Sequence, residues 1–381
     1  MNRIDDLIAK LCPKGVEFKE LGECAEYSNT RIDASKLDET NFVGVDNLLQ
    51  NAAGKADAKY PPNTARLTAY EVGDILLGNI RPYLKKIWLA DDGGGCSGDV
   101  LAIRITEAYR PKLMPEFLYR LMASDVFFAY NMQHAKGAKM PRGSKEAILK
   151  YRIPVPPLDV QREIVKVLDA FTQLEAELEA ELEARRRQYQ YYRDALLSFA
   201  GKDDIRWATL GEVAKSYRGT AITEAKTTDG IIPVVANSPL PVYFHGESNR
   251  SGETIVVARS GAYAGLITFW DQPIFLTDAF SIHPDVELLN TKFVYYFLQN
   301  KQSIIHSIKK GSGVPHVRVK DFESFRIPIP PLSEQARIVA ILDTFDALVN
   351  DLTSGLPAEI AARRTQYAHY RDRLLTFKEA A

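Results

Sequence analysis

Residues 151–199 decide the fold, because their sequence, YRIPVPPLDVQREIVKVLDAFTQLEAELEAELEARRRQYQYYRDALLSF, occurs a second time. Residues 325–377 read FRIPIPPLSEQARIVAILDTFDALVNDLTSGLPAEIAARRTQYAHYRDRLLTF. Arg152–Phe171 matches Arg326–Phe345 at a constant offset of 174, and the offset is 178 from Gln188 against Gln366, so the second copy contains four additional residues. A repeat of this length is not accidental. It predicts two related halves.

The segments between the copies also correspond, more weakly. The matching pairs are Val16–Glu23 with Ile205–Glu212, Gly73–Leu77 with Gly252–Val256, Asp99 with Asp278, and Lys136–Pro141 with Lys310–Pro315. We therefore predict a tandem with globular segments at 1–152 and 201–326 and helical segments at 153–200 and 327–381. The helical copies agree closely whereas the globular copies differ, which is the pattern expected of two segments that do the same task on different targets.

Each repeated segment is predicted to be a long helix. Pro156-Pro157 and Pro330-Pro331 hold the preceding chain extended, and Asp159 and Ser333 then suit the N-cap position. Apolar residues recur at intervals of three and four. In the first copy they are Ile164, Val167, Phe171, Leu174, Leu178, Leu182, Tyr189, Tyr192, Leu196 and Phe199; in the second they are Ile338, Ile341, Phe345, Leu348, Leu352, Leu356, Ile360, Tyr367, Tyr370, Leu374 and Phe377. Gly355 and Pro357 are expected to kink or break the second helix.

Two apolar stripes in one chain can cover each other. An intramolecular antiparallel coiled coil is the economical arrangement, and about 40 helical residues would make a rod of about 60 Å. Two globular units held by such a rod would be related by an approximate twofold axis. The alternative is that each helix is simply a core helix of its own domain.

The globular segments combine strands with helices, so the predicted class is α+β. Strands are expected at Val72–Leu77, Asp99–Ile105, Glu253–Ala258 and Gly265–Trp270. Helices are expected at Pro115–Gln133 and Asn290–Ser307, closed by Gly137 and Gly311.

Composition limits the function classes. The 48 Lys and Arg residues balance 49 Asp and Glu residues, so contact with nucleic acid requires a local basic patch. Cys12, Cys24 and Cys96 form no CxxC pair, which suits a reducing cytoplasm. The first residues lack a long apolar run, and the chain has no 18-residue apolar stretch, so we expect neither secretion nor membrane association.

At this point the residues indicate a family. The IPVPPLDVQREIV and IPIPPLSEQARIV boxes, the ARRRQYQYYRDALLSF and ARRTQYAHYRDRLLTF endings and the opening PKGVEFKELGE resemble type I restriction–modification specificity (S) subunits over essentially the whole chain. The resemblance implies two variable target-recognition domains, each reading half of a split site in double-stranded DNA. It also implies two spacer helices that dock two methyltransferase (M) subunits, and an assembly that can add restriction (R) subunits for translocation and cleavage.

No motif in the sequence indicates catalysis. FxGxG and (N/D)PP(Y/F), the usual adenine-methyltransferase signatures, are absent, and Gly93–Asp99 lacks the Lys-Ser/Thr of a phosphate-binding loop. The six histidines have no close metal-ligand spacing. We therefore expect no catalytic residues, no metal and no cofactor, with the chemistry supplied by partner subunits.

Basic residues concentrate at the same place in both halves, at 130–152 and 301–326. This pattern favours phosphate contacts, although solvated loop charges are the plain alternative. The phosphate candidates are Lys136, Lys139, Arg142, Lys309, Lys310 and Arg318; the candidates for reading bases in the major groove are Arg31, Arg81, Lys85, Arg218, Asn237 and Arg259. Arg185–Arg187 and Arg363–Arg364 are interpreted as a solvated helix flank paired with glutamates, with contact to DNA or an M subunit as the alternative.

Two other functions fit parts of the sequence. A coiled-coil scaffold without a role in DNA reading would also have near-neutral charge. A stand-alone DNA methyltransferase would need the cofactor motifs that are missing.

Overall fold

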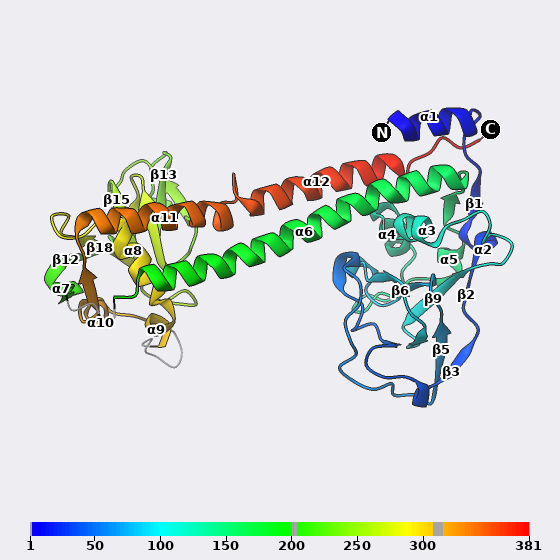
Figure 1. Cartoon of the computed structure of the whole chain (residues 1–381), viewed down its shortest axis with the longest axis horizontal. Coiled ribbons are helices and arrows are strands. Elements are labelled where there is room, and N and C mark those ends of the chain that lie inside the picture. Colours follow the sequence, from blue (N-terminus) through cyan, green and yellow to red (C-terminus); the bar gives the residue numbers. More distant parts are fainter. Residues whose placement is uncertain (1, 200, 202–203, 308–314, 381) are drawn as a thin grey trace. The chain divides into compact units, whose positions relative to one another are not determined.

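The computed structural model describes residues 2–199, 201, 204–307 and 315–380 (Figure 1). The chain divides into two compact units, of which unit 1 comprises 1–177 and 361–381 and unit 2 comprises 178–360. Both contain helices and sheets, which confirms the predicted mixed class in a tandem arrangement. The finer division into two globular and two helical segments stays a prediction, since each unit includes parts of both helical copies.

Unit 1 is built on an antiparallel sheet with the strand order β2-β9-β6-β7. Its strands are β2 (Ala25–Tyr27), β9 (Val100–Ile105), β6 (Ile75–Gly78) and β7 (Ile87–Leu89). The two middle strands are nearly fully buried. Both were predicted, although β6 begins three residues later than expected, because Gly73 adopts a left-handed φ of 88° and turns the chain into the strand.

A second sheet in unit 1 has the order β3-β5-β8-β4. Its strands are β3 (Arg31–Asp33), β5 (Arg66–Tyr70), β8 (Gly94–Cys96) and β4 (Phe42–Val43). β8 lies within the glycine run Gly93–Asp99. A Cβ on Gly94 would lie 2.0 Å from the carbonyl oxygen of Asn41, so this glycine permits the close approach of two strands.

The helices of unit 1 pack on the β2-β9-β6-β7 sheet and its connections. The helix predicted at 115–133 is divided into α3 (Pro115–Met122) and α4 (Asp125–Gln133). The division occurs because the Ser124 hydroxyl accepts a hydrogen bond from the backbone N–H of Phe127 and caps a new helix. The shorter helices are α1 (Asn2–Leu11), α2 (Leu21–Cys24) and α5 (Lys145–Leu149).

Unit 2 repeats the main sheet in the same order, β12-β18-β15-β16. Its strands are β12 (Ala214–Arg218), β18 (Ala279–Pro284), β15 (Glu253–Ala258) and β16 (Ile267–Asp271). A smaller sheet contains β14 (Tyr243–His245), β13 (Ile232–Val235) and β17 (Phe275–Leu276). The parallel pairing of β13 with β17 corresponds to that of β4 with β8 in unit 1.

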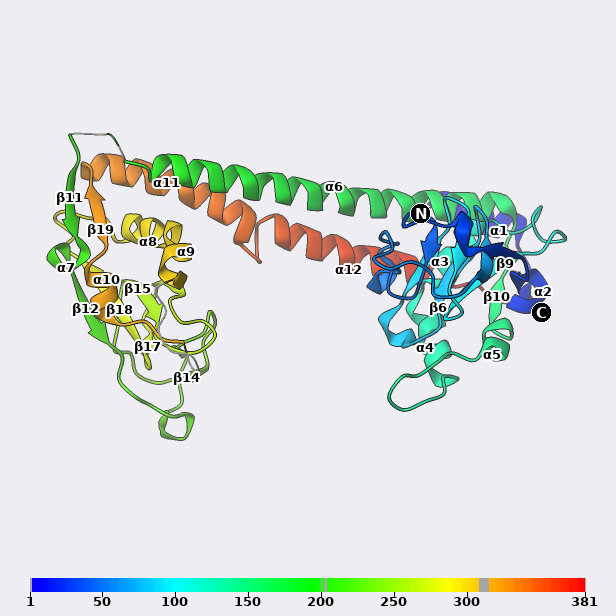
Figure 2. The same ribbon diagram turned by 90° about the horizontal axis from the view of Figure 1, so that it is seen from below.

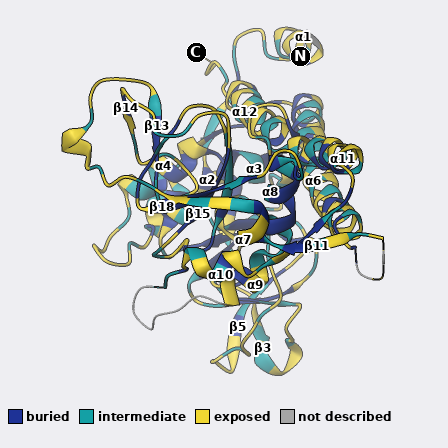
Figure 3. Ribbon diagram, turned by 90° about the vertical axis from the view of Figure 1, so that its left-hand side faces the viewer, coloured by how far each residue is buried: buried dark blue, intermediate teal, exposed yellow. Residues whose placement is uncertain are grey.

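The helix predicted at 290–307 is divided into α8 (Thr291–Asn300) and α9 (Gln302–Ser307). A short helix, α7 (Leu210–Val213), lies near the start of the globular part of unit 2, before β12. Phe293, Tyr296 and Phe297 of α8 are buried. Figure 3 shows α8 mostly in the colour of buried residues. The Asn290 side chain caps α8 by accepting from the backbone N–H groups of Lys292 and Phe293. Gly311, the predicted terminator, lies outside the described residues.

The globular part of each unit starts and ends on one antiparallel strand pair. β1 (Phe18–Glu20) pairs with β10 (Arg152–Pro154) in unit 1, and β11 (Arg206–Thr209) pairs with β19 (Arg326–Ile329) in unit 2 (Figure 2). α10 (Val319–Glu323) leads into β19. The chain leaves each pair through the double proline and enters a long helix.

The repeated segments form α6 (Leu158–Leu196), α11 (Leu332–Asn350) and α12 (Leu356–Leu374). The predicted N-caps Asp159 and Ser333 are wrong, because the helices begin one residue earlier and both residues lie in the first turn. The predicted break is confirmed: the second copy is interrupted between Asn350 and Leu356. Leu352, assigned to the apolar stripe, is 79% exposed in this interruption.

Within unit 1, the first part of α6 packs antiparallel on α12 (Figure 1). Phe171 stacks on Tyr370 with ring centroids 5.4 Å apart, and further along α6 Glu175 pairs with Arg364 at 2.5 Å. Because positions increase on one helix while they decrease on the other, the two helices run in opposite directions. Ile164 and Leu374 join the same buried core.

Within unit 2, the last part of α6 packs on α11. Tyr189 and Tyr192 both stack on Phe345, with centroids 6.2 and 5.4 Å apart. Each unit thus contains part of the first helical copy and part of the second. Arg185 pairs with Glu181 at 2.7 Å, as expected for a solvated helix flank.

A buried glutamine fixes each long helix to its globular part. Gln161, fully buried, accepts from Met114 N at 2.9 Å and donates to the carbonyl oxygens of Lys112 and Pro156, both at 2.7 Å. Gln335 occupies the same place in unit 2. It accepts from Asn290 N and donates to the carbonyl oxygens of Leu288 and Pro330.

An aspartate eight residues after each glutamine attaches the long helix to its globular part a second time. Asp169 bonds Arg120 of α3 at 2.6 Å. Its counterpart Asp343 accepts from the Tyr296 hydroxyl at 2.5 Å and pairs with Lys292 at 2.8 Å, both on α8. The repeated box therefore supplies the same two anchors to two globular parts that differ in sequence. None of the helices formed by the described residues combines the length and apolarity that crossing a membrane requires.

Candidate nucleic-acid interface

Several of the predicted DNA-binding residues of unit 1 lie at one end of the main sheet, where β6 ends and β9 begins. We call this end of the sheet, and its equivalent after β15 in unit 2, the edge. β6 ends at Gly78 and is followed by a tight turn through residues 79–85, and β9 begins beside it after Asp99. In this turn Arg81 and Lys85 have left-handed φ values of 52° and 50°. Non-glycine residues adopt this conformation at a cost of roughly 1 kcal/mol or more, which is typical of functional positions.

Unit 2 has the same turn after β15, with glycine at both left-handed positions. Gly261 (φ 81°) and Gly265 (φ 79°) lie 180 residues after Arg81 and Lys85. Unit 2 thus has glycine, which adopts a left-handed φ without strain, at both positions. Unit 1 has Arg81 and Lys85 there, so its turn is strained and carries two cationic side chains. An exposed tyrosine lies in each turn at equivalent positions: Tyr83 in unit 1 and Tyr263 in unit 2.

The basic loop 136–142 is fastened to the turn of unit 1 by backbone hydrogen bonds. Arg81 N donates to Pro141 O at 2.7 Å, and Gly143 N donates to Asn79 O at 3.1 Å. Lys136 and Arg142 close the loop by bonding each other's backbone in both directions. The structure thus brings Arg81, Lys136 and Arg142 together, with Lys139 exposed on the same loop.

The same fastening occurs in unit 2. Gly261 N donates to Pro315 O at 3.0 Å and Val317 N donates to Arg259 O at 2.9 Å. Lys309 and Lys310, predicted to contact phosphate, lie in 308–314, outside the described residues. The neighbouring Arg318 is exposed at the start of α10, where it pairs with Asp321 at 3.0 Å.

A carboxylate at this edge holds an arginine in each unit. Asp99 pairs with Arg142 at 3.0 Å. Asp278, its equivalent, pairs with Arg259 at 2.8 Å. Asp278 has a φ of 25° and accepts from the Asn237 side-chain amide at 2.7 Å, while Asn237 Oδ1 accepts from Arg259 N at 2.6 Å. Asn237 therefore holds the Asp278 carboxylate and the Arg259 backbone.

Beneath the basic loop of unit 1 lie two buried asparagines. Asn131 is 1% exposed, and among the described residues neither of its side-chain polar atoms has a hydrogen-bond partner; the same is true of Asn79 Oδ1. A Cβ on Gly143 would meet Asn131 Oδ1 at 2.4 Å and Asn79 Oδ1 at 2.8 Å. The glycine is required where the loop crosses these amides.

Three predicted base-reading candidates are placed differently. Arg31 is exposed on β3 and donates to Thr68 Oγ1 at 3.2 Å. Arg218 is exposed at the end of β12. The Lys85 ammonium pairs with Asp125, which also binds Arg371 of α12 at 2.7 Å, so Lys85 is engaged toward the helical layer.

Sequence reasoning did not select Asp99, Asp278, Asn79 or Asn131 as site residues. Only the aspartates had a signal, namely their equivalent positions in the two halves. The asparagines have none, because their role depends on contact with a loop distant in the sequence.

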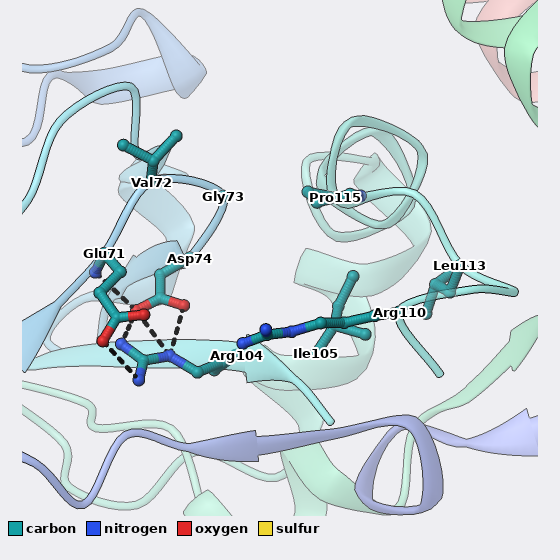
Figure 4. Close-up of a pocket in the computed structure, with 9 residues that line it drawn as sticks. All are labelled: Glu71, Val72, Gly73, Asp74, Arg104, Ile105, Arg110, Leu113 and Pro115. Atoms are coloured by element: carbon teal, nitrogen blue, oxygen red, sulfur yellow. Dashed lines mark hydrogen bonds and ion pairs between the residues drawn. The ribbon is translucent and has the colours of Figure 1, made fainter. Parts of the chain in front are cut away.

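A pocket of about 360 Å³ lies at the opposite end of β6 and β9 (Figure 4). Its floor is Arg104, which bonds Asp74 at 2.7 Å and Glu71 at 3.1 Å. The hydrogen bond to Asp74 raises the pKa of the Arg104 guanidinium. Since two carboxylates already neutralise this arginine, the pocket does not resemble an anion site.

Comparison with known proteins shows the family of the chain. The family described as "Type I restriction modification DNA specificity domain" matches residues 13–184 and 203–362. The chain is 36% identical over 257 residues to the Escherichia coli "Type I restriction enzyme EcoR124I/EcoR124II specificity subunit", covering 59% of this chain and 63% of that protein. It is 30% identical over 292 residues to a putative type I restriction enzyme specificity subunit of Haemophilus influenzae, covering 70% and 74%.

Solved structures share the fold. The S subunit of a type I restriction–modification system from M. genitalium has a TM-score of 0.63 at 14% identity, covering 95% of this chain and 96% of that chain. A chain from a structure of type I system assembly and conformational transition has a TM-score of 0.64 at 24% identity, covering 95% and 98%. The resemblance drawn from the repeated boxes is thus confirmed, and the protein belongs to the type I restriction–modification DNA specificity family.

Proposed function

We propose that the chain is the DNA-reading specificity subunit of a type I restriction–modification enzyme, with each unit reading one half of a bipartite, asymmetric site in double-stranded DNA. The observation that carries this proposal is the repeated edge. Both units present a turn after the central strand, a loop fastened to it and an aspartate–arginine pair, while most other side chains there differ. The same backbone arrangement with different side chains is what two domains that bind different half-sites require.

The edge has the chemistry that DNA binding needs although the whole chain is neutral. In unit 1, Arg81, Lys136 and Lys139 are exposed around one loop and can contact phosphates, which positions a reader without specifying sequence. Exposed Tyr83 and Tyr263 offer aromatic faces and hydroxyl groups at equivalent places in the two units.

We propose that the helices set the gap between the half-sites and dock two M subunits. α6, with 39 residues, has a length of about 58 Å at 1.5 Å per residue. It begins in unit 1 and ends in unit 2, which suits a spacer. Exposed apolar side chains on the helices, Tyr191 at 69% among them, provide surface for a partner.

In this proposal the chain itself catalyses nothing. The M subunits transfer the methyl group after the target adenine is flipped from the duplex, and R subunits add translocation and cleavage. A scaffold without DNA contact would not need the strained, cationic turn of unit 1, and a stand-alone methyltransferase would modify DNA without a partner.

Sequencing of modified bases in the DNA of cells that express the full chain with its M subunit tests the proposal. We expect one asymmetric motif with two specified parts separated by unspecified bases, and no modification when either protein is absent. Modification by this chain alone, or a continuous motif, would contradict the proposal.

A further inference from the structure

We propose that Arg142 and Arg259 each read a guanine, one in each half-site, and that Asp99 and Asp278 orient them. This inference rests on the proposed function and assigns base-reading residues within it. The aspartates are equivalent in the two units, but the arginines come from different segments: Arg142 from the fastened loop and Arg259 from the turn after β15.

The geometry fits a base edge. A guanidinium carries five N–H donors in a planar fork, and two of them match O6 and N7 of guanine in the major groove. In each pair one terminal nitrogen contacts the carboxylate, Nη1 for Arg142 and Nη2 for Arg259, which leaves further donors on the fork. A held guanidinium loses less rotamer freedom when it binds, so the aspartate favours a fixed orientation.

Charge argues against a phosphate contact for these two arginines. A paired arginine and aspartate carry no net charge, and a carboxylate is repelled by a phosphate. An uncharged, acceptor-rich base edge is the better partner. Arg81 and Lys136 are the residues suited to phosphates in unit 1.

Stability does not explain the pairs. The side chains of Arg142 and Asp99 are 56% and 39% exposed, and those of Arg259 and Asp278 are 44% and 51% exposed. Exposed pairs of this kind contribute little to folding because water and salt screen them. Asp278 nevertheless adopts a φ of 25°, which costs free energy, and accepts a hydrogen bond from Asn237 that holds its carboxylate beside the arginine.

The test uses the full chain in complex with its M subunits. Competition binding is measured on duplexes that carry the wild-type motif with each base pair replaced in turn. We expect Arg142→Ala to abolish the preference for one G·C pair in one half-site, a loss of roughly 5- to 150-fold in discrimination. Arg259→Ala should do the same in the other half-site. Arg142→Lys and Arg259→Lys retain the charge but not the planar fork, and should recover at most part of the preference.

Substitution of the aspartates distinguishes an orienting role from a structural one, because an orienting role predicts lower discrimination at one particular G·C pair. Asp99→Asn and Asp278→Asn should weaken discrimination at the same G·C pair as their arginine partners. Because each substitution removes a negative charge, affinity for unrelated DNA should rise or stay equal.

Matched controls are Arg152→Ala and Arg337→Ala. Arg152 pairs with Glu379, and Arg337 pairs with Glu334, at similar exposure but away from the edge. Neither should alter any base preference. If the wild-type complex binds a bipartite motif but the Arg142 and Arg259 variants, including the lysine forms, keep its base preferences or lose them at a pair other than G·C, the inference is wrong and the proposed function stands. A wild-type complex without a bipartite motif would overturn both.

Discussion

Replacing Gln161 by leucine should selectively destabilise unit 1. Leucine has a similar volume, so the main loss is three hydrogen bonds of a fully buried amide. The Pro156 carbonyl oxygen would remain buried without a partner, and the Met114 N–H and the Lys112 carbonyl oxygen would lose theirs in partly buried positions. At about 1–3 kcal/mol for each unsatisfied group, partly offset by the apolar side chain, we expect a loss of about 3 kcal/mol.

Hydrogen exchange of the full chain, resolved by peptide, measures this effect in each unit. A loss of about 3 kcal/mol corresponds to roughly 150-fold faster exchange of the β9 amides that open with the whole unit. β18 in unit 2 should be unaffected. Gln335→Leu should produce the reciprocal result, faster exchange in β18 and not in β9.

The control is Gln173→Leu, since Gln173 is exposed and bonds only Glu177 among the contacts observed. We expect a change within about 0.5 kcal/mol. Two results would contradict this role of Gln161 in attaching α6 to the globular part of unit 1. One is that Gln161→Leu changes the exchange rate in β9 no more than this control does. The other is that it changes the exchange rates in β9 and β18 equally.

Three further outcomes follow from named contacts. Arg120→Ala removes the bonds from α3 to Asp169 and Thr172 of α6 and to Tyr367 of α12, and should cost about 1–3 kcal/mol in unit 1, measured by urea unfolding with β9 exchange as the readout; no change would show that these contacts are dispensable. Gly143→Ala should lower stability by about 1–3 kcal/mol in thermal unfolding, because the new methyl group meets buried amide oxygens; an unchanged midpoint would contradict the close approach. At pH 8 iodoacetamide should label Cys12 before unfolding but not Cys24 or Cys96, because burial raises the pKa of these two thiols to about 11 and about 12 and leaves almost no thiolate; rapid labelling of either would refute their burial.

Much of the fold could be predicted because the helical boxes repeat and their apolar periodicity is strong. The interruption at Gly355 was expected from residue type alone. The helix starts were misplaced because the helices begin directly after Pro157 and Pro331, which lie two residues ahead of the polar residues that suit a cap. The split at Ser124 was missed because the apolar pattern continues across it, and only the hydroxyl contact to Phe127 N reveals the second helix.

The site was harder to predict because it is assembled from segments distant in sequence. Basic residues in 136–142 were visible as a cluster, but their attachment to Arg81 depends on backbone hydrogen bonds. Lys85 was selected for its charge, and only the fold shows that Asp125 holds it. Asp99 and Asp278 appeared as aligned positions, yet their partners come from non-equivalent segments, which a sequence repeat cannot indicate.

Exchange of a whole reader tests the two-reader proposal most directly. Residues 18–154 begin with β1 and end with β10, which pair with each other in unit 1. Residues 206–329 begin and end in the same way with the pair β11 and β19 in unit 2. A chain in which 206–329 replaces 18–154 should, with its M subunits, modify a motif made of two copies of the half-site read by unit 2. Persistence of the original asymmetric motif, or the appearance of bases belonging to neither half, would contradict independent reading by the two units.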